Sequence, residues 1–151
     1  MKCKVILAIF ALCSFTLFSQ TLDLKYNANT GDAELDLTLA DLNVQAKADL
    51  DGFKAELSVS YGTSQDEIGN LLDNEKMEPA DVYMALELTN IVRKPLDTVV
   101  KTYAENKERG WGYIAKQLGI KPGTPEFKAL KSKSSERTRE NKSKAKGKSK
   151  E

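Results

Sequence analysis

The chain has 151 residues, with 23 Lys and Arg, 22 Asp and Glu, two cysteines and no histidine. Both cysteines, Cys3 and Cys13, lie in an N-terminal segment that we expect to be removed, so the mature protein would have neither thiol nor imidazole. This composition excludes disulfide bonds, cysteine nucleophiles, Ser-His-Asp triads and the usual zinc ligands from the mature chain.

Residues 1–19 have the pattern of a secretory signal peptide. Lys2 and Lys4 precede an almost unbroken apolar run from Val5 to Phe18, and Ser19 provides a small residue for cleavage. The run is shorter than the roughly 20 apolar residues that a membrane-spanning helix needs. We therefore expect export to the periplasm or the medium, cleavage after Ser19, and no stable membrane insertion afterwards.

Residues 20–61 alternate apolar and polar side chains with a period of two, which is typical of half-buried strands. The leucines from Leu35 to Leu39 follow this alternation, and it resumes out of phase at Leu42. Asp51-Gly52 predicts a tight hairpin turn, because glycine accepts the positive φ that such a turn requires. The pattern predicts an antiparallel meander of three or four strands.

Residues 62–131 show the apolar spacing of helices instead. Ser64 and Glu67 form the pattern of a capping box, and Pro79 fits the first position of a helix that ends near Val92. Because this helix is apolar on most sides, we expect it at the centre of the fold. Further helices are predicted at three points: Pro95, Trp111 and Pro125. Together these features predict one α+β domain, a meander packed against four or five short helices.

Charge is unevenly divided along the chain. Thr21 to Leu130 carries 12 Lys and Arg against 19 Asp and Glu, a net charge of −7, whereas residues 131–151 carry 9 against 3, a net charge of +6. Residues 132–151 have no large apolar side chain and are predicted to be a disordered basic tail. Its cations are the candidate polyanion-binding residues: Lys131, Lys133, Arg137, Arg139, Lys142, Lys144, Lys146, Lys148 and Lys150. The alternative is that the tail only increases solubility.

Trp111 lies between two glycines, as in some exposed aromatic platforms for ligands. Its spacing to Ile114, Ala115 and Leu118 is that of one helix face, so we expect it to be buried in the core.

Paired carboxylates are the remaining candidates for chemistry. Asp81 and Glu87 lie on one predicted helix, and Asp97 and Glu105 lie on another. Asp81 and Asp97 fall in first helical turns, where a carboxylate complements the helix dipole without any catalytic role. We therefore predict a protein that is not an enzyme and has no catalytic, cofactor-binding or metal-ligating residues.

Residues 114–130 suggest an alternative function in nucleic-acid binding. The order of Ala115, Gly119 and the flanking apolar residues resembles the turn of a helix-turn-helix unit. However, Pro125 and Lys128 occupy positions where that unit packs aliphatic side chains, and an acidic, exported domain is unsuited to binding phosphate on a chromosome. Sequence-specific DNA binding is therefore the second hypothesis, with the basic tail as its support.

Five motifs carry a family resemblance: Glu78-Pro-Ala-Asp-Val-Tyr-Met84, Lys94-Pro95, Gly110-Trp-Gly-Tyr-Ile-Ala-Lys116, Leu118-Gly-Ile-Lys-Pro-Gly123 and Glu126-Phe-Lys-Ala-Leu-Lys131. With them, residues 77–131 resemble a family of small exported bacterial proteins that has no assigned activity. The resemblance implies a small, exported, non-enzymatic protein with a β-rich stretch before its helices, and it brings no catalytic residues. Lys128 departs from the family pattern, which has histidine there. We accordingly predict an exported envelope protein that binds a polyanion or a protein partner.

Overall fold

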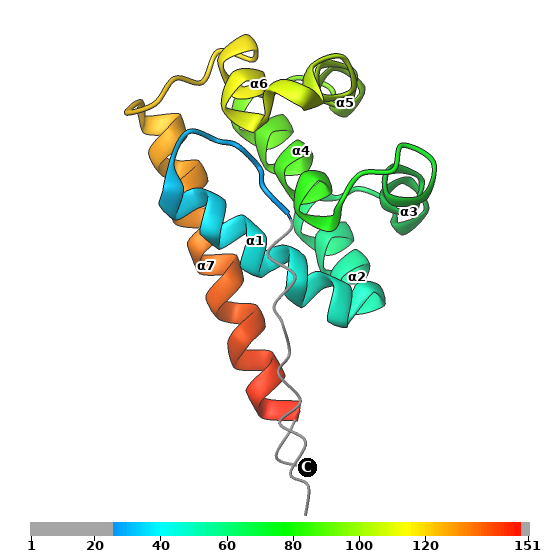
Figure 1. The fold of residues 1–151 in the computed structure, drawn as a ribbon. Coiled ribbons are helices and arrows are strands. Elements are labelled where there is room, and N and C mark those ends of the chain that lie inside the picture. The colour runs from blue at the N-terminus through cyan, green and yellow to red at the C-terminus, as the bar shows by residue number, and fades with distance from the viewer. Residues whose placement is uncertain (1–25, 149–151) are drawn as a thin grey trace, which may run out of the picture.

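A computed structural model describes residues 26–148 of the chain, and these residues form helices joined by short connections (Figure 1). A short 3₁₀ turn, Lys107–Arg109, lies between α5 and α6. The predicted signal peptide, residues 1–19, lies outside the described part. The seven α-helices are α1 (Ala33–Ala48), α2 (Leu50–Tyr61), α3 (Gln65–Asp73), α4 (Pro79–Val92), α5 (Leu96–Asn106), α6 (Trp111–Gln117) and α7 (Pro125–Lys148).

The predicted meander, and with it the α+β fold class, is wrong, because residues 33–61 form α1 and α2 and residues 26–148 contain no strand. The buried leucines of α1 are Leu35, Leu39 and Leu42, spaced as one face of a helix, whereas Leu37 is 66% exposed. The break in the two-residue alternation between Leu39 and Leu42 is therefore the helical period. Composition agrees, since this stretch is rich in Ala and Leu, which favour helices.

The Asp51-Gly52 pair lies in the first turn of α2 and not in a hairpin. Asp49 is the N-cap of that helix, and its Oδ1 accepts a hydrogen bond from the Gly52 N–H at 3.1 Å. A Cβ atom at position 52 would lie 2.6 Å from the Asp49 carboxylate, so glycine leaves room for the cap. The Asp-Gly motif is therefore part of the beginning of a helix and not of a hairpin turn.

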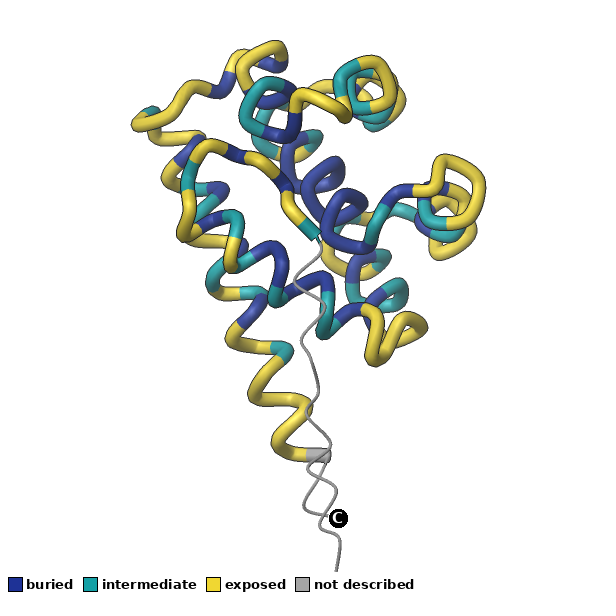
Figure 2. Tube along the Cα trace, in the orientation of Figure 1, coloured by how far each residue is buried: buried dark blue, intermediate teal, exposed yellow. Residues whose placement is uncertain are grey.

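Helix α4 is the centre of the molecule, as predicted (Figure 2). Its residues are buried continuously from Pro79 to Leu88. Asn43 of α1 holds its beginning, because the Asn43 Oδ1 accepts from the Ala80 N–H at 3.1 Å and the Asn43 Nδ2 donates to Glu78 at 3.0 Å. The predicted first position of Pro79 is confirmed.

Of the predicted capping box at the preceding helix, the structure shows the Ser64 half. The Ser64 hydroxyl accepts a hydrogen bond from the Glu67 N–H at 3.1 Å at the beginning of α3. Caps are local features, set by residues three apart in the chain, which is why sequence alone locates them.

The predicted disordered tail is instead the larger part of α7, which is helical to Lys148. Helix α7 lies beside α1 and runs parallel to it (Figure 1). The register follows from paired residues in order along both helices: Lys131 contacts Asp32, and further on Lys142 contacts Asp41. The C-terminal turns of α7 extend beyond the end of α1 (Figure 1).

The buried face of α7 begins with two large apolar residues and continues with small hydroxyl residues. Phe127 and Leu130 are buried, and the same face continues with buried Ser134 and Thr138. The Ser134 hydroxyl donates to the Leu130 carbonyl at 2.8 Å, and the Thr138 hydroxyl donates to the Ser134 carbonyl at 3.0 Å. With their hydroxyls satisfied inside their own helix, these small side chains can be buried without loss of a hydrogen bond. An ordered helix is therefore compatible with the absence of large apolar residues.

The segment before α1 is docked on the beginning of α6. The Trp111 N–H donates to the Ala28 carbonyl at 2.8 Å, and the Gly112 N–H donates to the Asn29 carbonyl at 3.0 Å. A Cβ atom on Gly112 would lie 2.3 Å from the Thr30 carbonyl oxygen, closer than real Cβ contacts. The glycines around Trp111 therefore allow the two backbones to meet.

Candidate functional site

The basic residues of α7 are sorted onto two flanks of the helix. Because successive helical residues turn by 100°, Lys131 and Lys142 lie on the flank toward α1, while Lys133, Arg137 and Lys144 lie on the opposite flank, toward α2 and α4. Each of the five is paired with a carboxylate of the acidic body. The sequence predicted the charge asymmetry, and the structure shows where it is neutralised.

On the first flank, the Lys131 Nζ lies 2.9 Å from an Asp32 oxygen and 3.0 Å from a Glu34 oxygen. Hydrogen bonds from Lys131, and then the N-cap bond from the Leu35 N–H, lower the pKa of Asp32. The same bonds from Asp32 and Glu34 raise the pKa of Lys131. Lys142 pairs with Asp41 at 2.6 Å further along.

On the second flank, an Arg137 nitrogen lies 2.6 Å from Glu56 of α2, and Arg137 also donates to the Ser60 hydroxyl at 3.0 Å. Lys144 reaches the same Glu56 oxygen at 2.8 Å. Lys133 lies 2.7 Å from Glu87 of α4. Arg137 is embedded, with 12% of its side chain exposed, whereas Lys144 is 59% exposed.

The remaining candidate residues lie elsewhere. Arg139 and Lys146 are exposed on α7. The side chain of Lys148 and the whole of Lys150 lie outside the described part. Lys131, Lys133 and Arg137 connect α7 to the body, and the cations from Arg139 onward occupy its outer half. We call residues 139–148 the distal basic segment.

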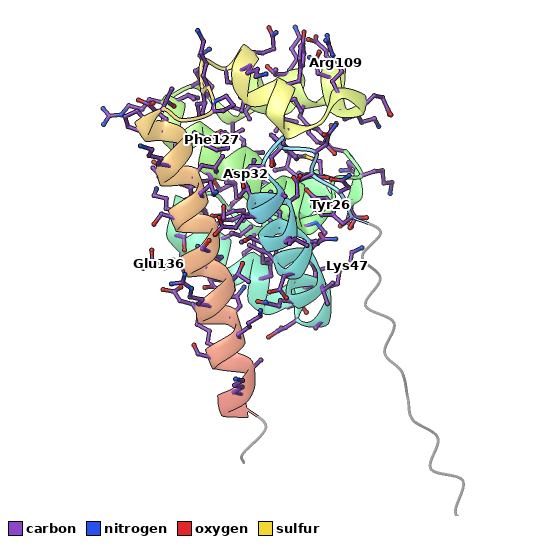
Figure 3. The ribbon with its side chains drawn as sticks, turned by 60° about the vertical axis from the view of Figure 1, so that its left-hand side comes forward. Tyr26, Asp32, Lys47, Arg109, Phe127 and Glu136 are labelled. Atoms are coloured by element: carbon purple, nitrogen blue, oxygen red, sulfur yellow. The ribbon has the colours of Figure 1, made fainter. Side chains whose placement is uncertain are left out.

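A polar cleft of about 330 Å³ opens between α2, α4 and α7. Its floor contains the buried side chains of Tyr83 and Glu87. Glu136 contributes to its α7 wall, about midway along the helix (Figure 3). The other lining residues are Ser60, Tyr61, Asn90, Lys133, Arg137 and Glu140.

Glu87 is the ionisable group at the floor of this cleft, with only 2% of its side chain exposed. Its Oε2 accepts a short hydrogen bond from the Tyr61 hydroxyl. Its Oε1 lies 2.7 Å from the Lys133 Nζ, but that approach lacks the angle of a directed hydrogen bond. One oxygen of a buried carboxylate is thus held only by a flexible, half-exposed lysine.

Two tyrosines form the aromatic part of the cleft. The Tyr61 and Tyr83 rings meet edge to face, with centroids 6.5 Å apart. Burial, and then the neighbouring charge of Glu87, raise the pKa of Tyr83 to about 12 despite the hydrogen bond to Ser134. Burial also raises the pKa of Tyr61, together with its neighbours Tyr83 and Glu87. Both hydroxyls stay protonated at neutral pH, so the Tyr61 hydroxyl keeps the proton that it donates to Glu87.

The cleft carries a net negative charge. It is lined by Glu87, Glu136 and Glu140 together with Lys133 and Arg137, and Arg137 is already paired with Glu56 of α2. A carboxylate at the floor repels an anion and attracts a cation.

Asp81 forms a second buried polar cluster, on another face of α4. Its Oδ1 accepts from the Tyr26 hydroxyl and the Trp111 Nε1, both at 2.7 Å, and its Oδ2 accepts from the Tyr103 hydroxyl at 2.9 Å. The Glu78 N–H also donates to Oδ2 at 3.2 Å. Trp111 is 2% exposed, so the predicted core position of this residue is confirmed. This cluster connects four segments of the chain and has a structural role.

Asp81 and Glu87 do not form a catalytic pair. Six residues of helix separate them by about 9 Å along the axis and by about 240° around it. Each carboxylate has its own donors, Trp111 and two tyrosines for Asp81 and Tyr61 for Glu87. In residues 26–148, no three Asp, Glu, His or Cys side chains are grouped as a metal site requires.

The segment 114–130 contains the end of α6, a connection and the beginning of α7, but the connection, residues 118–124, is longer than the three or four residues of a helix-turn-helix unit. Helix α6 ends at Gln117, and α7 begins at Pro125. Gly119 turns the chain with a φ of +102°, and the Ile120 N–H donates to the Ala115 carbonyl at 2.8 Å. Its apolar residues are part of the core: Ile114, Leu118, Ile120, Phe127 and Leu130.

Comparison of the chain with family models, with curated proteins and with solved structures returned no match. The family resemblance of residues 77–131 therefore stays a prediction. None of the helices within residues 26–148 combines the length and the apolar character that crossing a bilayer requires.

Sequence reasoning weighed Glu87 only as half of a hydrolase pair and missed the cleft. One signal was available: Glu87 is a charged residue between Leu86 and Leu88, in a helix predicted to be apolar on most sides. A charge at such a position has to be paired or hydrogen-bonded. Its partners, Tyr61 and Lys133, lie 26 and 46 residues away in the chain, so no local pattern could identify them.

Proposed function

We propose that this protein is an exported, non-enzymatic binding protein of the cell envelope that contacts a polyanion through the distal basic segment of α7. The observation that carries the proposal is the position of this segment. It holds Arg139, Lys142, Lys144 and Lys146 on exposed helical turns, the last of which extend beyond α1 (Figure 1).

The ion pairs of this segment are of the kind that a polyanion can replace. Lys142 and Lys144 are 57% and 59% exposed, and an ion pair whose lysine is open to solvent usually stabilises a protein by only about 0–1 kcal/mol. A phosphate-rich or sulfate-rich polymer could take over these lysines at little cost to the fold. Lys131 and Arg137 are more deeply embedded in their pairs and would continue to hold α7 on the body.

The test is a binding measurement with heparin and with duplex DNA of random sequence. We compare the full mature chain with a variant in which Lys142, Lys144 and Lys146 are changed to Gln. The matched control changes three exposed lysines at the α5 end of the molecule to Gln: Lys94, Lys101 and Lys107. Both variants lose the same charge, so a nonspecific effect of net charge would weaken them equally.

The expected result is weaker binding of heparin and DNA by the α7 variant alone. On duplex DNA, its log–log salt dependence should become shallower by about 0.9 for each phosphate that the variant no longer neutralises. Equal weakening of both variants would contradict a localised site. A preference for one DNA sequence, abolished when Lys116 and Lys121 are changed to Gln, would instead favour the helix-turn-helix hypothesis.

A further inference from the structure

We propose that the cleft between α2, α4 and α7 is a binding site for a primary alkylammonium group, with Glu87 as its receptor and Lys133 as a built-in occupant. This proposal concerns the opposite charge and is centred on Glu87 of α4 and Lys133 of α7, which lie outside the distal basic segment.

The floor of the cleft is suited to an ammonium ion. Glu87 is buried, one of its oxygens is fixed by Tyr61, and the other faces the cleft without a directed hydrogen bond. A primary ammonium brings three N–H donors and a full charge, the same group that Lys133 presents to Glu87 at 2.7 Å.

The walls of the cleft suit the rest of such a ligand. The half-buried ring of Tyr61 lines the cleft and can contact an alkyl chain, while Tyr83 is buried beneath it. Glu136 and Glu140 lie on the α7 wall and are exposed, so a second ammonium at the outer end would find a carboxylate. The volume of about 330 Å³ lies within the range of small-molecule pockets.

The ammonium group of Lys133 already occupies the position on Glu87 that we propose for a ligand ammonium. Its ammonium reaches Glu87 at 2.7 Å while 46% of its side chain remains exposed. A side chain with that exposure can leave the cleft, and a ligand ammonium can then take its place on Glu87. Lys133 therefore acts as an intramolecular competitor. Its removal would leave the buried Glu87 carboxylate without its ion-pair partner, which favours binding of an external cation.

The first experiment titrates the mature protein with cadaverine, 1,5-diaminopentane, and follows heat and thermal stability. Three proteins are compared: the unchanged chain, Lys133→Ala, and Lys128→Ala as the matched control. Lys128 is an exposed lysine of the same helix outside the cleft. We expect Lys133→Ala to bind cadaverine about tenfold more tightly than the unchanged chain and to melt at a higher temperature in its presence. Lys128→Ala should behave as the unchanged chain.

The second experiment establishes that Glu87 is the receptor. In the double variant Lys133→Ala, Glu87→Gln, cadaverine should neither bind nor stabilise. This variant lacks the uncompensated charge, so it is expected to fold, and its helical circular dichroism checks this. Tetramethylammonium, which has the charge without N–H donors, should stabilise Lys133→Ala less than cadaverine does. Equal effects of the two cations, or an equal response of Lys128→Ala, would overturn the proposal.

A free diamine and a lysine side chain of a partner protein present the same chemical group. Binding of cadaverine that exceeds that of N-acetyl-lysine methylamide, and that weakens in Glu140→Gln, indicates a free diamine. The reverse order indicates a lysine of a partner protein. Failure of both to bind Lys133→Ala would contradict an ammonium site and would leave the α7 polyanion proposal unaffected.

Discussion

The indole N–H of Trp111 donates to the carboxylate of Asp81 at 2.7 Å, in a part of the core from which water is excluded. The Trp111 ring also stacks on Tyr103, with centroids 5.0 Å apart, and Tyr103 donates to the other oxygen of the same carboxylate. Asp81 therefore connects α4, α5, α6 and the segment before α1 through donors that carry no charge.

Asp81→Ala should lower the free energy of unfolding by about 3–5 kcal/mol, because buried donors of Trp111 and two tyrosines lose their acceptor. Denaturant unfolding followed by the fluorescence of Trp111, the only tryptophan, measures this change. The control is Asp97→Ala, which removes an exposed first-turn carboxylate and should cost only about 0.3–1 kcal/mol. Equal losses in the two variants would mean that the Asp81 hydrogen bonds contribute nothing beyond the helix dipole.

Gly112→Ala should detach residues 26–30 from α6, because its Cβ would lie 2.3 Å from the Thr30 carbonyl oxygen and backbone cannot yield easily. We expect a loss of about 1–3 kcal/mol, the usual range for an overpacked site. In Gly69→Ala, by contrast, nothing lies within 4 Å of the new Cβ in α3, and removal of a helical glycine should stabilise by up to about 1 kcal/mol. Thermal melting should show a lower melting temperature for Gly112→Ala and a higher one for Gly69→Ala than for the unchanged chain.

A chain that ends at Leu130 should melt at a clearly lower temperature than the full chain, since it lacks most of α7, including the residues that pair with α1 and α2. It no longer has the buried Ser134 and Thr138 or the Arg137–Glu56 pair. A chain that ends at Asn141 retains all three and should melt close to the full chain. Identical melting of all three proteins would show that α7 beyond Leu130 does not contribute to stability.

Stability should fall as the pH rises above 10. Burial raises the pKa of Tyr83 to about 12 and raises the pKa of Tyr26, Tyr61 and Tyr103 as well, against an ordinary value of 10.0. The unfolded chain therefore releases these protons at a lower pH than the folded chain, and ionisation favours unfolding. The stabilisation is complete below pH 10 and is lost as the pH approaches the folded values.

Absorbance of tyrosinate at 295 nm and helical circular dichroism, recorded together, check this prediction. We expect most of the tyrosinate signal to appear together with the loss of helix. Full ionisation of the tyrosines in a protein that keeps its helices would show that these hydroxyls are accessible.

The sequence predicted how the charges are distributed along the chain, but it did not predict which charged residues pair with one another. An acidic body and a basic C-terminal stretch were predicted, and both exist. Their pairing depends on α7 running parallel to α1 and beside α2, with partners such as Lys142 and Asp41 separated by about a hundred residues. No spacing rule connects residues that far apart.

By itself, the sequence determined the local features: the cap at Ser64, the beginning of the helix at Pro79, and the burial of Trp111. Each depends on neighbours within about one or two helical turns. Only the tertiary structure decided that residues 33–61 are helices, because a leucine-rich alternation suits a strand and a helix alike until one face is buried. It also decided that a polar stretch is ordered, since small hydroxyls such as Ser134 pack well only against a neighbouring helix, and that Glu87 lies at the floor of a cleft.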